Sequence, residues 1–234
     1  MKDKYTVLAF DLSSVCVGVV AAIIDTNKRE PIIVKSCPII PKSFNPETLG
    51  YRKSKKKILT GKSGEMINSY YMQGEITVSK AEKKKRDALI RAKSNAFALK
   101  YIGEQITKII TSIEPDLIIV EKNEIFNGVL TSVLLGKVMG VLVGIASSKG
   151  IDVEEHKVKV VRSIINLTKI THDLVDNLTE EEILKIPDVT KRALRKYMEG
   201  KYAKYGLKCE TDDESDACVV FNYWLEEKFK KYNS

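Results

Sequence analysis

The sequence predicts a single α/β domain with basic insertions, on three grounds. First, its 234 residues are enough to bury a full hydrophobic core. Second, 44% of the residues are hydrophobic and 30% are charged, which is typical of globular proteins and argues against disorder or a polytopic membrane protein. Third, short β-branched runs alternate with long stretches of helical periodicity, as in α/β folds.

The first half of the chain begins with two near-continuous apolar runs, residues 5–12 and 15–24, which predict an antiparallel hairpin. Residues 31–37 supply a third strand. Residues 41–78 place prolines and glycines among lysines, the composition of a long basic loop. From 80 to 113, apolar residues recur every three or four positions, which predicts a helix.

In the second half, residues 117–120 form a β-branched run suited to the middle of a sheet. A helix is predicted over 128–149 and a strand over 151–161. Residues 166–187 form an insertion in which a capping box at Thr179 predicts the start of a short helix. A basic amphipathic helix is predicted next, over 189–205. The last helix begins at Thr211 or Asp212, where an N-cap and acidic residues precede an apolar stretch.

The net charge of +8 is unevenly distributed along the chain. Residues 28–100 contain 18 Lys and Arg against 6 Asp and Glu, whereas the rest is slightly acidic. Lysines outnumber arginines, which suits phosphate neutralisation better than the reading of bases. A solvated surface explains an isolated run such as 83–86, but not an excess of +12 in one segment. A polyanion is the predicted partner, with candidate contacts at Lys55, Lys56 and Lys57.

The cysteines do not predict a zinc site. None of the four belongs to a Cys-x-x-Cys pair, and only two histidines are available to join them. Buried, reduced thiols in a cytoplasmic protein are the simpler interpretation. The amino terminus has no evident small-residue cleavage site of a signal peptide.

Residues 129–148 imitate a transmembrane span that carries glycines at a spacing of four, Gly136, Gly140 and Gly144. Lys137 lies inside this stretch, and nothing else in the chain resembles a span. A helix packed within the protein is therefore expected, with no membrane partner.

Four carboxylates stand where a core would exclude them. Asp11 lies in an apolar strand, Glu121 ends another strand, and Asp213 and Asp216 share a face of the last helix. Local roles as turn cap, lysine partner and helix-start residues are the alternative. Ligands bind at strand ends in open α/β sheets, which favours a functional role for Asp11 and Glu121. If all four converge, their repulsion demands cations, and Mg²⁺ or Mn²⁺ suits oxygen ligands.

The order of these motifs resembles the RuvC family of Holliday-junction resolvases, and most of all its phage members. The resemblance rests on Ala9-Phe10-Asp11-Leu12-Ser13-Ser14, on Leu117-Ile-Ile-Val-Glu121, and on Asp213-Glu-Ser-Asp216-Ala217. It covers residues 5–40 and 97–232. It implies an RNase H-like fold, a mixed central sheet flanked by helices, forming one catalytic domain over 1–234. Residues 41–96 would be a basic insertion and 166–187 a small helical insertion.

The resemblance also implies the chemistry. Asp11, Glu121, Asp213 and Asp216 would bind two Mg²⁺ or Mn²⁺ ions, with Asp212 and Glu214 leaving the third ligand open by one residue. The enzyme would resolve Holliday junctions and other branched DNA by paired hydrolytic cuts that leave 5′-phosphates.

Further residues take DNA-binding roles by the same resemblance. Lys159 occupies the position of a basic residue near the scissile phosphate, at the end of a strand that also carries Lys157. Lys191 is a second basic candidate, and Phe126 resembles an aromatic residue that stacks at the junction centre. The helix with the glycine stripe resembles the family's homodimer helix. A phage enzyme of this kind would act in the host-cell cytoplasm.

Two other functions remain open at this point. In a non-catalytic DNA-binding or architectural protein, the basic segment would suffice and the carboxylates would be structural. An actin-like or sugar-kinase-like phosphotransferase also has a strand–Asp-x-Ser-Ser–strand hairpin. The sequence has neither a second such hairpin nor an adenine-site glycine pair.

Overall fold

The computed structural model describes residues 2–13, 15–42, 45, 51–53, 58–59, 66–67, 70–72, 80–122 and 129–232. The chain divides into two compact units. One comprises Met1–Pro41 with Tyr101–Ser234, and the other comprises Lys42–Lys100.

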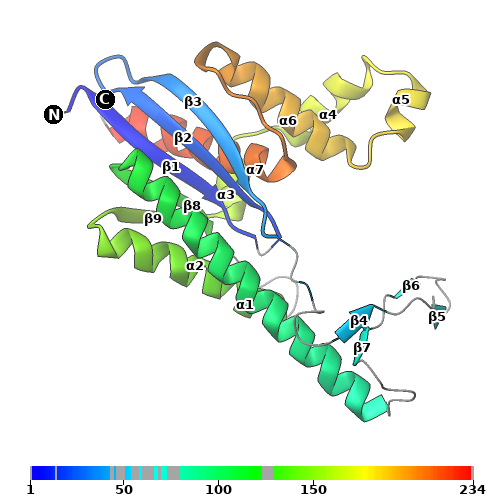
Figure 1. The fold of residues 1–234 in the computed structure, drawn as a ribbon. Helices are drawn as coiled ribbons and strands as arrows, with labels where there is room; N and C mark the ends of the chain where they lie inside the picture. Colours follow the sequence, from blue (N-terminus) through cyan, green and yellow to red (C-terminus); the bar gives the residue numbers. More distant parts are fainter. Residues whose placement is uncertain are drawn as a thin grey trace. The chain divides into compact units, whose positions relative to one another are not determined.

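The first unit is built on a five-stranded sheet with the order β3-β2-β1-β8-β9 (Figure 1). Strands β1 (Lys4–Asp11), β2 (Val17–Asp25) and β3 (Glu30–Ile39) are antiparallel. Strand β8 (Leu117–Lys122) pairs parallel to β1, and β9 (Asp152–Lys157) pairs parallel to β8. This mixed sheet flanked by helices confirms the predicted fold class. It also means that β1, β8 and β9 end at one edge of the sheet.

Helices cover both faces of the sheet (Figure 1). On one face, Val7, Ala9 and Ile119 belong to a core that includes residues of the last long helix, α7 (Asp212–Tyr223), and of α6 (Val189–Tyr202). Successive side chains of a strand alternate between faces. Figure 1 shows α2 (Val129–Ser148) and the part of α1 (Lys80–Ile113) that belongs to this unit, from Tyr101 on, on the side of the sheet opposite α7.

The remaining elements of the first unit follow β9. They are α3 (Val158–Arg162), α4 (Leu167–Val175), α5 (Glu180–Leu184), a 3₁₀ turn (Ala203–Tyr205), a π-helical segment after α7 (Trp224–Phe229) and α8 (Lys230–Tyr232). The predicted capping box at Thr179 is confirmed, because Thr179 and Glu182 bond reciprocally at the start of α5. None of the helices in the described residues is both long and apolar enough to span a membrane.

The prediction of a strand over 151–161 is wrong in its second half. Among the described residues, the ladder between β8 and β9 ends at the pair Lys122 and Lys157. The chain turns instead into α3, which buries Val161 in the core against α7. Lys159 therefore lies on a short helix and not on a strand.

The second unit contains two short antiparallel pairs in the region predicted to be a basic loop. Strand β4 (Tyr51–Lys53) pairs with β7 (Tyr70–Met72), and β5 (Ile58–Leu59) pairs with β6 (Met66–Ile67). Lys55, Lys56 and Lys57 lie outside the described residues.

Candidate active site

Two of the predicted carboxylates come from adjacent parallel strands. Asp11 is the last residue of β1, and Glu121 is the penultimate residue of β8. Phe10 is in register with Val120, so the residues that follow these two emerge beside each other at the carboxyl edge of the sheet. The Glu121 side chain is buried and Asp11 is partly buried.

The start of α7 reaches this edge because residue 18 is a glycine. Gly18 is the cross-strand partner of Asp11. A Cβ atom on Gly18 would lie 1.9 Å from the carbonyl oxygen of Asp213 and 2.8 Å from the backbone nitrogen of Glu214. Only a residue without a side chain allows this approach, which brings Asp213 and Asp216 towards Asp11.

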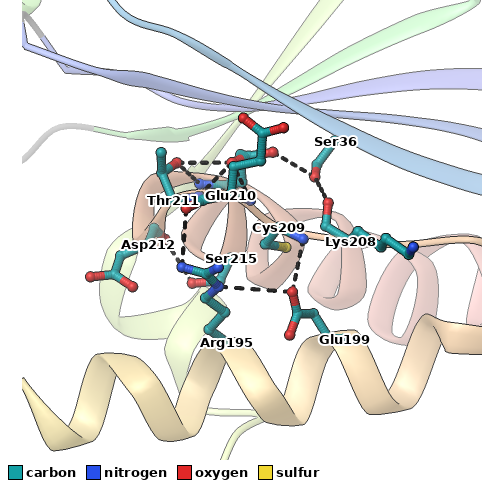
Figure 2. A network of polar contacts seen from close by, with 10 residues as sticks. Ser36, Arg195, Glu199, Lys208, Cys209, Glu210, Thr211, Asp212 and Ser215 are labelled. Carbon is teal, nitrogen blue, oxygen red and sulfur yellow. Dashed lines mark hydrogen bonds and ion pairs between the residues drawn. The ribbon is translucent and has the colours of Figure 1, made fainter. Parts of the chain in front are cut away.

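A polar network fixes the segment before α7 (Figure 2). The backbone N–H of Cys209 donates to Glu199, and Arg195 donates to the carbonyl of Glu210. Ser36 on β3 donates to the carbonyl of Lys208. These contacts tie residues 208–210 to both α6 and β3, so the last helix begins at a defined place.

Glu214 completes this anchor, although no basic side chain among the described residues forms an ion pair with its carboxylate. It is fully buried. Its carboxylate accepts from the backbone N–H groups of Glu210 at 2.8 Å and Thr211 at 2.7 Å. It also lies 2.7 Å from the Ser36 hydroxyl, whose single hydrogen it shares with the Lys208 carbonyl. Thr211 in turn caps the backbone N–H of Glu214, forming a capping box. Glu214 is therefore engaged in holding the helix, which leaves Asp213 as the more accessible acid of the two.

The electrostatics show that the four carboxylates lie near one another. The pKa of Asp11 is raised to about 8, mainly by burial and in addition by the negative charges of Asp216, Glu121 and Asp213. Burial is also the main reason that the pKa values of Glu121 and Asp216 are raised. Burial, together with a hydrogen bond to the Asp213 carboxylate, raises the pKa of the Cys16 thiol to about 12.

Two basic side chains face the same carboxylates. Arg162, the last residue of α3, places Nε 3.6 Å from Oε1 of Glu121 and Nη2 3.5 Å from Oδ1 of Asp216. Lys191 on α6 places Nζ 4.0 Å from the other oxygen of Asp216, Oδ2. The positive charge of Arg162 lowers the pKa values of Asp11, Glu121 and Asp216, which opposes the increase caused by burial.

The sequence prediction did not include Arg162, because the strand expected over 151–161 concealed the turn of α3. A signal was present, since few of the arginines lie outside the basic segment and a guanidinium suits a pair of carboxylates. Lys157 and Lys159 are exposed, and neither forms an ion pair with the four carboxylates. Phe126 lies outside the described residues.

The donor set fits a hard divalent cation by its chemistry. It consists of carboxylate oxygens gathered at one edge, with more negative than positive charge around them. In the described part of the chain, however, no three His, Cys, Asp or Glu side chains lie close enough to hold an ion as they stand. The guanidinium of Arg162 bridges Glu121 and Asp216 in this arrangement.

Comparisons with known proteins find no matching family model and no matching curated protein. Solved structures do match. RuvC of T. thermophilus in complex with a Holliday junction substrate has a TM-score of 0.48 at 10% identity, covering 96% of this chain and 97% of that one. Another Thermus thermophilus RuvC structure has a TM-score of 0.46 at 10% identity, covering 95% and 96%.

A third match is the yeast mitochondrial Holliday junction resolvase Ydc2, with a TM-score of 0.45 at 13% identity, covering 97% of this chain and 81% of that chain. With identities of 10–13% and TM-scores below 0.5, these likenesses say nothing about the chemistry of this chain.

Proposed function

We propose that this chain is a metal-dependent endodeoxyribonuclease that cuts Holliday junctions and other branched DNA. The observation that carries the proposal is the convergence of Asp11, Glu121, Asp213 and Asp216 from two strands and a helix. Their proximity is expressed in the pKa of Asp11, which burial and the other three carboxylates raise to about 8. A protein does not gather such repulsive groups without a use for them, because each costs stability unless a cation compensates it.

Hydrolysis of a phosphodiester follows from this donor set. Asp11, Glu121, Asp213 and Asp216 would hold two Mg²⁺ or Mn²⁺ ions, which would supply an activated water and charge stabilisation at the leaving 3′-oxygen for hydrolysis to a 5′-phosphate. The protein contributes a fixed frame for these ligands, since β1 and β8 are central strands and α7 is anchored by Glu214. Lys191 lies at the mouth of the site, 47% exposed, where it can neutralise an incoming phosphate.

The basic residues outside the site would hold the DNA arms by phosphate contacts. Lys157 and Lys159 are exposed on the chain that leaves β9, within a few residues of Arg162. The lysines of 41–96 are a separate group of charges suited to backbone contacts, which favour shape over sequence.

Paired cuts require two copies, and we assign the dimer contact to α2. Gly136, Gly140 and Gly144 are exposed, and a Cβ on any of them would meet none of the described residues within 4 Å. The opposite face of the helix carries the buried Val138 and Leu142. Packing within the chain therefore leaves the glycine stripe available to a second copy related by a two-fold axis.

The experiment that tests the function compares a labelled four-way junction with a linear duplex of matching sequence, each incubated with the protein and Mg²⁺ and resolved on denaturing gels. The wild type should nick the junction symmetrically and leave the duplex intact. Asp11→Asn should lose cleavage to background while retaining junction binding in a mobility-shift assay. Asp152→Asn, an exposed aspartate on β9, is the matched control and should cut normally.

Two outcomes would contradict the proposal. If Asp11→Asn still cuts the junction at the wild-type rate, Asp11 does not belong to the reacting centre. If the wild type binds the junction and cuts neither substrate with Mg²⁺ or Mn²⁺, the DNA-binding or architectural alternative is the better description.

A further inference from the structure

Arg162 is held in an unusual position for a surface arginine. It closes α3, and its guanidinium contacts two carboxylates that belong to different elements, Glu121 on β8 and Asp216 on α7. Its side chain is 45% exposed, whereas each of the two carboxylates is only 10% exposed. The anions are thus fixed inside the fold, and the cation reaches them from the solvent side.

The contacts are also loose. Distances of 3.6 Å and 3.5 Å are longer than the 2.7–2.9 Å of a strong charge-assisted bond. A long, partly exposed side chain with two long contacts can leave at little cost. The charge it carries nevertheless matters to the site, because Arg162 is the main cation that offsets the repulsion at Glu121 and at Asp216.

The guanidinium and a divalent ion require the same oxygens. Arg162 contacts Oε1 of Glu121 and Oδ1 of Asp216, whereas Lys191 approaches the other oxygen of Asp216 and does not separate the two acids. Bound Mg²⁺ draws its ligands to about 2.1 Å, which the carboxylates cannot meet while a guanidinium lies between them. The absence of a chelating trio among the described residues agrees with this arrangement.

We propose that Arg162 is an internal counter-ion that occupies the cation position of the site and must withdraw when a divalent metal binds, so that it competes with the metal and weakens its binding. This inference rests on the proposed function, because it takes the four carboxylates as the metal ligands. It assigns to Arg162 a role in metal affinity that its place in the sequence did not predict.

Direct binding of Mn²⁺ tests the inference without reference to cleavage. The metal-free protein is titrated with Mn²⁺ by calorimetry, and free Mn²⁺ is counted in parallel by electron paramagnetic resonance. Arg162→Gln should bind Mn²⁺ at least three-fold more tightly than the wild type. Arg162→Lys keeps the charge but cannot bridge both acids, so it should also bind more tightly, by a smaller factor. Arg192→Gln, at an exposed position on α6, is the matched control and should bind as the wild type does.

The outcomes separate the inference from the function. If the wild type and both Arg162 variants bind Mn²⁺ equally, or the variants bind it more weakly, the role of Arg162 is wrong and the metal site stands. If Mn²⁺ binds none of the proteins, the metal site and the inference both fall. Thermal melts in EDTA accompany each titration. Arg162→Lys decides the question if Arg162→Gln does not fold.

Discussion

The raised pKa of Asp11 makes a prediction about the stability of the metal-free protein. The unfolded chain releases the Asp11 proton near its ordinary pKa of 3.8, whereas the folded chain holds the proton up to about pH 8. The folded state therefore binds more protons than the unfolded state between these values. Its stability falls as the pH rises through that window.

The size of the effect follows from the shift. Each unit of pKa is worth about 1.4 kcal/mol, so the change from 3.8 to about 8 sets an upper limit of roughly 5 kcal/mol by pH 8. Asparagine has no proton to lose and escapes this cost. Asp11→Asn should match the wild type near pH 4 and exceed its stability at pH 8. At about 2–4 °C per kcal/mol, the melting temperature should rise by about 10 °C if most of the effect is expressed.

The assay is a melting curve in EDTA across pH 4–8.5 for the wild type, Asp11→Asn and the control Asp152→Asn. The gain in Asp11→Asn should grow with pH, and the control should show no such growth. If the difference between Asp11→Asn and the wild type is the same at pH 5 and pH 8, Asp11 does not lie among the other carboxylates. The reasoning about the site would then be refuted.

The remaining predictions concern the frame, the dimer and the basic segment. Gly18→Ala should destabilise the fold by about 3 kcal/mol or more in urea unfolding, because its methyl group would collide with the backbone of α7. The control Gly200→Ala, whose Cβ would meet none of the described residues within 4 Å, should be neutral or slightly stabilising. Equal effects of the two variants would contradict the close approach of Gly18 to Asp213. Glu214→Ala should lower the free energy of unfolding by about 3 kcal/mol in the same measurement. Glu214→Gln should lower it by only about 1–2 kcal/mol, since the amide oxygen can still accept from the backbone N–H groups. A larger loss of stability in Glu214→Gln than in Glu214→Ala would be inconsistent with the capping role. Gly140→Leu should run as a monomer in analytical ultracentrifugation, and a persisting dimer places the interface elsewhere. Deletion of residues 45–78 should flatten the salt dependence of junction binding, and an unaltered slope means that those lysines do not contact phosphate.

Most of the sheet and all four carboxylate positions could be proposed from local patterns in the sequence. Apolar runs interrupted by Asp11 and Glu121 identify both the strands and their functional ends, because a buried strand excludes an acid that has no partner. The N-cap and acidic residues around Thr211 likewise indicate the start of the last helix and, with it, Asp216. These signals depend only on neighbouring residues in the sequence, and the structure contains the strands and the helix that they predict.

The features that escaped prediction depend on partners far away in the sequence. Val158, Val160 and Val161 have strand propensity, yet they lie in α3, where Val161 packs in the core and Arg162 contacts Glu121 and Asp216. Gly18 is unremarkable within an apolar run, and only the position of Asp213 explains why it has no side chain. The packing of a short helix in the core and the close approach of two backbones depend on tertiary contacts, so composition and periodicity cannot predict them.

The ligands of the site span nearly the whole chain, from position 11 to position 216, and this separation orders events during synthesis. A nascent polypeptide that has emerged as far as β9 already carries Asp11 and Glu121, but it lacks the helix that supplies the other two acids and covers β1, β2 and β8. Domains acquire their cores only when the last packing element arrives. If the four acids are the metal ligands of the proposed nuclease, a growing chain would be unable to cut DNA, because these acids come together only in the finished fold.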